Sequence, residues 1–150
     1  GACDVSPRGD PPGFVAVLDD HRLLLPDRKG NNRLDALRNV LVNPHVGLSF
    51  IVPGIDDTLR VNGRASITTD RALLEPLAVR GVVPKAGLLV EVVEAFLHCG
   101  RAFKRGRVWD PDGFAQRGEL PTLAEMLRDQ TRPDAEEDRL LARSEREPLY

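Results

Sequence analysis

The sequence predicts a mostly β protein, an antiparallel barrel with short helices packed outside it. Strand-like segments occur in pairs joined by short turns, within residues 14–25 and within residues 45–68, and such pairs are typical of antiparallel hairpins. The helical segments are too few and too short for the regular crossovers of a parallel sheet. With 150 residues, the chain is long enough for one domain with its own hydrophobic core.

The first hairpin follows a loop. Residues 6–13 contain three prolines and two glycines, which exclude a regular element there. The short apolar run at residues 14–18 predicts a buried strand, and the polar residues 19–22 predict a turn. Residues 23–25 then begin the return strand of the hairpin.

A helix is expected after the next loop, at residues 26–31. Asn32 is the candidate N-cap. Apolar residues then recur at helical spacing, at Leu34, Leu37, Val40 and Leu41. The helix should end near Val42, because Asn43 precedes a proline and is therefore pushed out of the helical region.

A second hairpin follows this helix. Apolar and polar residues alternate through residues 45–52, and residues 53–57 read as a turn. Residues 58–68 form the clearest strand, with apolar side chains on one face and polar ones on the other. Gly63 inside this strand suggests a bulge or a close approach of another backbone.

The remaining elements are shorter. Asp70 should cap a short helix that ends at Leu77, and residues 88–93 should form a further strand. Residues 98–105 predict a helical turn or short helix, and residues 121–130 predict an amphipathic helix.

The chain should divide into residues 1–130, one domain, and residues 131–150, a charged C-terminal helix or tail. Ten of the sixteen residues from Arg132 to Glu147 are charged, which is typical of a solvated or disordered segment.

Composition excludes several classes of protein. The formal net charge of −2 gives no reason to expect nucleic acid as a partner. No apolar run approaches the roughly 20 residues that span a bilayer, and no signal peptide is recognised, so we expect a cytoplasmic protein. The cysteines and histidines show no metal-ligand spacing, and Cys99 is expected to be a buried free thiol.

The loop before the first helix carries the main candidate site. Three cations lie within six residues, with a glycine and two asparagines between them (Arg28, Lys29, Gly30, Asn31, Asn32 and Arg33). The helix that follows directs its N-terminal N–H groups and positive dipole end toward the same space. This combination predicts an anion site, and phosphate is the usual occupant. The spacing alone leaves a solvated basic turn as an equal alternative.

Two further clusters are weaker candidates. Arg60 and Arg64 lie on the polar face of the strand at residues 58–68, which either faces water or lines a subunit contact or ligand. Four cations precede or surround Trp109, the single tryptophan, which either anchors the core or stacks on a planar ligand or a partner. Neither paired carboxylates nor a Ser-His-Asp arrangement stands out, so the catalytic residues stay unknown.

Four ordered blocks carry a family resemblance. They are DVSPRGDPPGFV at residues 4–15, LLPDRKGNNRLDALRN at 24–39 with NPHVGL at 43–48, LRVNGRA at 59–65, and AFLHC at 95–99 through WDP at 109–111. Together they resemble the pyridoxamine 5′-phosphate oxidase-like, FMN-binding split-barrel superfamily. More narrowly, they resemble its uncharacterised bacterial subgroup with the pattern PDRxGNNRxDxLRN. The resemblance covers most of residues 3–112.

The resemblance implies an antiparallel split β-barrel that forms a homodimer, with FMN in the interface. It implies a phosphate site at Arg28, Asn31, Asn32 and Arg33. It also implies flavin contacts from Phe14, Val15, Pro26 and Asp27, from Thr58 or Arg60 of the other subunit, and from Arg107 and Trp109. The expected function is that of an FMN-dependent oxidoreductase acting on a small molecule whose identity the sequence does not give.

Two departures from the family pattern bear on these expectations. Relatives usually place a helix and a first barrel strand ahead of the block at residues 4–15, so the chain is expected to be a fragment or to lack upstream residues. The substrate-binding residues of true pyridoxamine phosphate oxidases are not recognised, so pyridoxal phosphate synthesis is not implied. Two alternatives to an enzyme stay open: a flavin-binding or sensor protein without turnover, and a dimeric interaction protein without cofactor.

Overall fold

The computed structural model describes residues 4–30, 34–116, 118–131, 134–136 and 139. The chain separates into two compact units, Gly1–Gly106 and Arg107–Tyr150, which are considered separately. The boundary expected after residue 130 stays a prediction.

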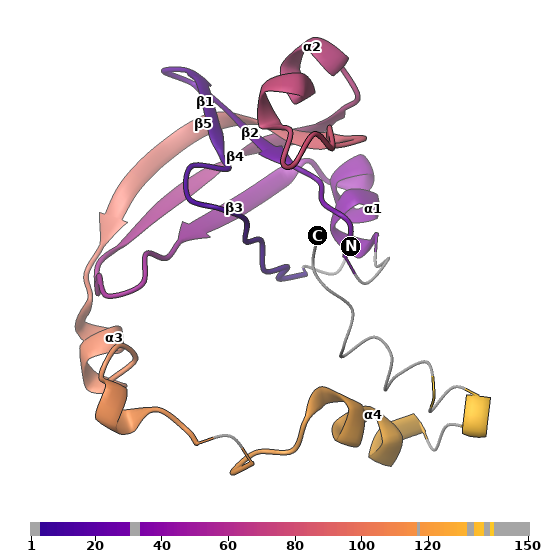
Figure 1. Cartoon of the computed structure of the whole chain (residues 1–150). Helices are drawn as coiled ribbons and strands as arrows, with labels where there is room; N and C mark the ends of the chain where they lie inside the picture. The colour runs from indigo at the N-terminus through magenta and orange to yellow at the C-terminus, as the bar shows by residue number, and fades with distance from the viewer. Residues whose placement is uncertain (1–3, 31–33, 117, 132–133, 137–138, 140–150) are drawn as a thin grey trace. The chain divides into compact units, whose positions relative to one another are not determined.

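The first unit is built on one antiparallel sheet of five strands (Figure 1). The strands are β1 (Ala16–Asp19), β2 (Arg22–Pro26), β3 (His45–Phe50), β4 (Thr58–Thr68) and β5 (Gly87–His98). Their order in the sheet is β1-β2-β5-β4-β3, with every pair antiparallel. The predicted fold class is therefore confirmed. Within the described part of the chain, β1 and β3 are sheet edges and the sheet does not close.

Short helices connect some of these strands. The helix α1 (Asp35–Val42) lies between β2 and β3, and α2 (Arg71–Leu74) with the 3₁₀ helix η1 (Glu75–Leu77) lies between β4 and β5. The helix α3 (Arg101–Arg105) follows β5. The cap predicted at Asp70 is confirmed, because its side chain accepts a hydrogen bond from the Ala72 N–H at 2.9 Å. At α1 the N-cap position is held by Leu34, without a side-chain hydrogen bond. The predicted cap Asn32 lies outside the described residues.

The hydrophobic core lies where α1 packs against the sheet. Leu25, Val40, Ala65 and Val90 are buried together there, on β2, α1, β4 and β5. The register places Ala65 opposite Val90, so these two side chains share one face of the sheet. Burial of this face is what fixes the register of the central strands.

The strand predicted at residues 58–68 is confirmed with both of its ends as β4. The bulge suggested by Gly63 is also confirmed, because the register with β5 shifts between Asn62 and Gly63. A Cβ atom at Gly63 would collide with the backbone carbonyl of Glu91 and lie 3.1 Å from Val90 Cγ1. Glycine at this position therefore permits the close approach of β4 and β5.

Two predicted strand ends are wrong. The strand predicted at residues 88–93 continues as β5 to His98, because its second half pairs with the first half of β4. The same extension takes His98 out of the helix expected at residues 98–105, which begins at Arg101. The strand predicted to reach residue 52 ends at Phe50, the last residue of β3 that pairs with β4.

The second unit contains a 3₁₀ helix, η2 (Pro111–Gly113), and the helix α4 (Leu123–Thr131). A reciprocal pair of hydrogen bonds starts α4. The Glu125 N–H donates to Thr122 Oγ1 at 3.2 Å, and the Thr122 N–H donates to Glu125 Oε2 at 2.7 Å. This capping box explains why the helix begins where the sequence predicted it, within two residues.

The capping box makes the start of α4 sensitive to pH. The Thr122 backbone N–H, and then its hydroxyl, hold the pKa of Glu125 below its ordinary value. The stabilisation is therefore complete above the ordinary carboxyl pKa and is lost as the pH falls through the lowered value. In an acid titration followed by backbone NMR, residues of the first turn of α4 should lose helical shifts. Glu125→Gln keeps an acceptor without titrating, so that variant should show no such transition.

Candidate functional site

The loop expected to bind phosphate begins at the end of β2. Pro26 is buried and pairs with Gly87 of β5. The Asp27 N–H donates to the Ala86 carbonyl at 2.9 Å, and the Asp27 carboxylate accepts from Arg8 Nη1 at 2.9 Å. The loop therefore leaves the sheet from a backbone position that two other segments hold in place.

Arg28 is bound within the protein. Its Nε donates to the Asp10 carboxylate, and its Nη2 donates to the Leu77 carbonyl at 2.7 Å. The Asp10 side chain is 0% exposed and that of Arg28 is 20% exposed. One guanidinium thus joins the N-terminal loop, the end of η1 and the start of the candidate phosphate loop.

The remainder of the loop runs toward α1. Lys29 and Gly30 are exposed. The predicted phosphate residues Asn31, Asn32 and Arg33 lie outside the described residues. The first turn of α1 contains Asp35, an acidic residue whose carboxylate opposes anion binding at this helix start.

An apolar pocket of about 450 Å³ lies beside the first hairpin and is lined in part by β4 and β5. Phe14 and Val15, both predicted flavin contacts, line it. Its apolar wall also includes Phe50, Leu59, Val61, Val92 and Ala95. Its size lies within the range of small-molecule sites. The structure thus brings two of the predicted flavin contacts into one apolar pocket, which Pro26, Asp27, Thr58 and Arg60 do not line.

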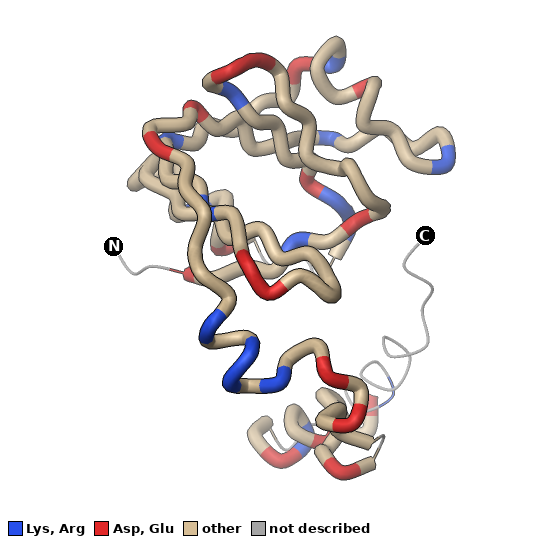
Figure 2. Tube along the Cα trace, turned by 90° about the vertical axis from the view of Figure 1, so that its left-hand side faces the viewer, with Lys and Arg blue, Asp and Glu red and all other residues tan. Residues whose placement is uncertain are grey.

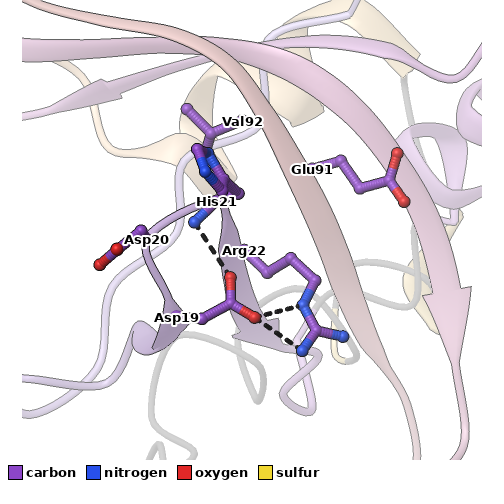
Figure 3. Close-up of a pocket in the computed structure, with 6 residues that line it drawn as sticks. All are labelled: Asp19, Asp20, His21, Arg22, Glu91 and Val92. Carbon is purple, nitrogen blue, oxygen red and sulfur yellow. Dashed lines mark hydrogen bonds and ion pairs between the residues drawn. The ribbon is translucent and has the colours of Figure 1, made fainter.

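A second, more polar depression of about 630 Å³ lies at the turn between β1 and β2 (Figure 3). The Asp19 carboxylate accepts from the His21 backbone N–H at 3.0 Å and from Arg22 Nε at 2.7 Å. These two contacts, in that order, hold the pKa of Asp19 below its ordinary value. The contacts stabilise the hairpin turn, and none of the predicted site residues lines this depression.

The structure separates the two candidates on the long strand β4. The Thr58 side chain is buried at 6% exposure, whereas Arg60 is exposed, with its guanidinium 5.5 Å from the centre of the Phe96 ring. A contact across a subunit interface requires an accessible side chain, so Arg60 is the better candidate of the two. Arg64 is also exposed, and its Nη1 lies 3.2 Å from His45 Nε2.

Arg107 and Trp109 belong to the second unit. Arg107 adopts a positive φ of 49°, and its guanidinium forms an ion pair with Asp110 at 2.6 Å. Trp109 is half-buried. Their contact with a flavin stays a prediction.

Two features were missed or misjudged at the sequence level. Cys99 is an exposed free cysteine, so the expectation of a buried thiol is wrong. It follows the last residue of β5, and the neighbouring side chains at that end of the strand are exposed. Several basic residues lie along α3, just beyond Cys99 (Figure 2).

The sequence alone did not single out Asp10. Only its charge, opposite to that of Arg28, could have indicated the Asp10–Arg28 ion pair.

Within the described ranges, no group of three or more His, Cys, Asp or Glu side chains could hold a metal ion. No described helix is long and apolar enough to cross a membrane.

An antiparallel sheet of this strand order, accompanied by short helices, is consistent with the split-barrel class of proteins. A family model described as pyridoxamine 5'-phosphate oxidase matches residues 2–99, and the chain therefore belongs to this family.

Solved structures with a similar fold include HupZ of Group A Streptococcus, with 24% identity and a TM-score of 0.44, covering 56% of this chain and 68% of that one. A histidine-to-alanine variant of HupZ gives 23% identity and a TM-score of 0.45, covering 57% and 73%. Neither likeness carries a functional conclusion. A comparison with curated proteins finds no match for this chain.

Proposed function

We propose that this chain binds FMN and acts as an FMN-dependent oxidoreductase on a small-molecule substrate. The observation that carries the proposal is the basic loop of a family member, anchored at the end of β2 and leading into α1. Loop cations and a helix N-terminus together favour a phosphate group. The proposed phosphate residues are Arg28, Asn31, Asn32 and Arg33.

The described residues fit the remainder of the cofactor as well. Phe14 and Val15 line an apolar pocket next to the strand that leads into the loop, and an apolar pocket suits a planar ring. Pro26 and Asp27 do not line this pocket; they lie at the start of the loop, where we propose that they contact the flavin between the pocket and the phosphate. A bound flavin supplies the electron transfer, while the protein binds, orients and shields the ring.

The proposed site is shared between two copies of the chain. Arg60 is exposed on β4 and is our candidate for the contact from the partner subunit. Arg107 and Trp109, which come later in the sequence, are also proposed to contact the flavin ring. Aliphatic side chains are exposed where the start of β4 pairs with the end of β5, and Leu97 is 78% exposed there. We propose this surface as the contact with the second copy.

The visible spectrum of the purified protein tests the proposal directly. A flavin absorbance that remains after gel filtration, or that appears when FMN is added, is the expected result. A colourless protein that does not take up FMN would contradict flavin binding and favour an interaction protein. Bound FMN that neither NADPH nor NADH bleaches would favour a flavin-binding protein without turnover.

Arg33→Ala should weaken FMN retention. A charge-assisted hydrogen bond to phosphate contributes roughly 1.5–3 kcal/mol, so the dissociation constant should rise by about ten- to a hundredfold. Equilibrium titration of the apoprotein with FMN measures the change. Arg71→Ala is the matched control, because the exposed Arg71 guanidinium pairs with Glu75 and not with a residue of the loop. Equal FMN affinity in wild type and Arg33→Ala would remove Arg33 from the site.

A further inference from the structure

The buried carboxylate of Asp10 is not used by the proposed function. Its side chain is 0% exposed, in a segment without regular secondary structure. Carboxylates are almost never fully buried without a charged partner, and Asp10 has Arg28 as one partner. Removing either charge would leave the other without its partner in the protein interior, which is costly. The ion pair therefore holds the N-terminal loop at Asp10 to the loop after β2 at Arg28.

Arg28 extends this coupling to a third segment. While its Nε contacts Asp10, its Nη2 donates to the Leu77 carbonyl at 2.7 Å. The preceding residue, Asp27, is held by the Ala86 carbonyl and by Arg8. The chain is therefore fixed at two consecutive residues at the start of the candidate phosphate loop. A planar guanidinium with several donors suits this joint, and a lysine ammonium would not reproduce its fork.

We propose that Asp10 and Arg28 are a positioning pair that fixes the start of the phosphate loop. This inference rests on the proposed FMN site and refines the role of Arg28 within it. Two of its donor atoms are committed to the protein, so its main contribution is to hold the backbone that leads to the phosphate. Anion sites gain affinity when donors are held in place before binding, because ordering them later costs free energy.

Removing the Asp10 carboxylate should change FMN affinity in opposite directions if Arg28 positions the loop and if it only attracts the phosphate by its charge. The Asp10 carboxylate is a negative charge paired with a proposed phosphate residue. If Arg28 acted only through its charge, removing the competing carboxylate would strengthen the binding of an anion. If the pair positions the loop, the same change weakens binding although a repulsive charge has been removed.

The experiment compares FMN with riboflavin, which has the same ring but no phosphate. Asp10→Asn and Arg28→Lys are titrated with both flavins by fluorescence, alongside the wild type. Each variant should bind FMN roughly tenfold or more weakly, the size of one lost charge-assisted hydrogen bond, with unchanged affinity for riboflavin. Glu75→Gln is the control, since it removes the carboxylate of the exposed Arg71–Glu75 ion pair on α2 and η1.

The outcomes are distinct. FMN affinity that is unchanged or higher in Asp10→Asn would overturn the positioning role while the proposed function stands. Equal losses for FMN and riboflavin would show a general effect on folding and would also overturn it. If the wild type binds neither flavin, the proposed function fails, and this inference fails with it. Arg28→Lys keeps the positive charge, so it remains informative if Asp10→Asn folds poorly.

Discussion

Gly63→Ala should strongly destabilise the sheet. The added Cβ would collide with the Glu91 backbone carbonyl and contact Val90 Cγ1 at 3.1 Å. Neither strand can move away freely, because β5 is hydrogen-bonded to β2 on one side and to β4 on the other. We expect a loss of about 3 kcal/mol or more, at the upper end for overpacked sites. That is a large fraction of the roughly 5–15 kcal/mol that stabilises a domain.

Urea unfolding followed by circular dichroism measures this loss. Gly47→Ala is the matched control, because Gly47 lies on the neighbouring strand β3 and its Cβ would meet only the end of the Asn62 side chain, at 3.3 Å. The control should stay within about 1 kcal/mol of the wild type, since a side chain can shift where a backbone carbonyl cannot. A wild-type midpoint for Gly63→Ala would mean that β4 and β5 are farther apart than the structure places them.

Gly63 also shows how far the sequence could predict the sheet. The alternation through residues 58–68 gave both ends of β4, because one face of that strand is buried and the other is polar. The second half of β5 could not be found in the same way. After the bulge, every residue from Val93 to His98 is exposed, so burial no longer leaves a pattern in the sequence. Pairing with β4 alone keeps these residues extended.

The sequence likewise predicted one part of the candidate site and missed another. The basic loop after β2 was identified from its composition, because cations and a helix start are adjacent in the chain. The internal contacts of Arg28 were not, because Asp10 and Leu77 approach it only in the folded chain. A cation in the sequence reads the same whether it binds a ligand or a buried carboxylate. Only burial of the partner distinguishes the two.

The long strands β4 and β5 expose adjoining apolar side chains where the start of β4 pairs with the end of β5. Val93 and Leu97 of β5 are 73% and 78% exposed, and Leu59, which pairs with Leu97, is 40% exposed. Exposed apolar side chains that adjoin one another mark interaction surfaces. Leu97→Asp should therefore leave the single chain folded but separate the proposed dimer. Burying an unpaired carboxylate in an apolar contact costs several kcal/mol, so the dimer dissociation constant should rise by about a hundredfold or more.

Sedimentation or light scattering at matched concentrations measures this change, with the thermal midpoint of unfolding as a check on folding. Val82→Asp is the control, because Val82 is 69% exposed, is also aliphatic and lies between η1 and β5. Since the flavin is proposed to lie between subunits, Leu97→Asp should also lose FMN, whereas Val82→Asp should retain it. A Leu97→Asp protein that remains dimeric would place the interface elsewhere. A monomeric variant that still binds FMN would show that one chain forms the site by itself.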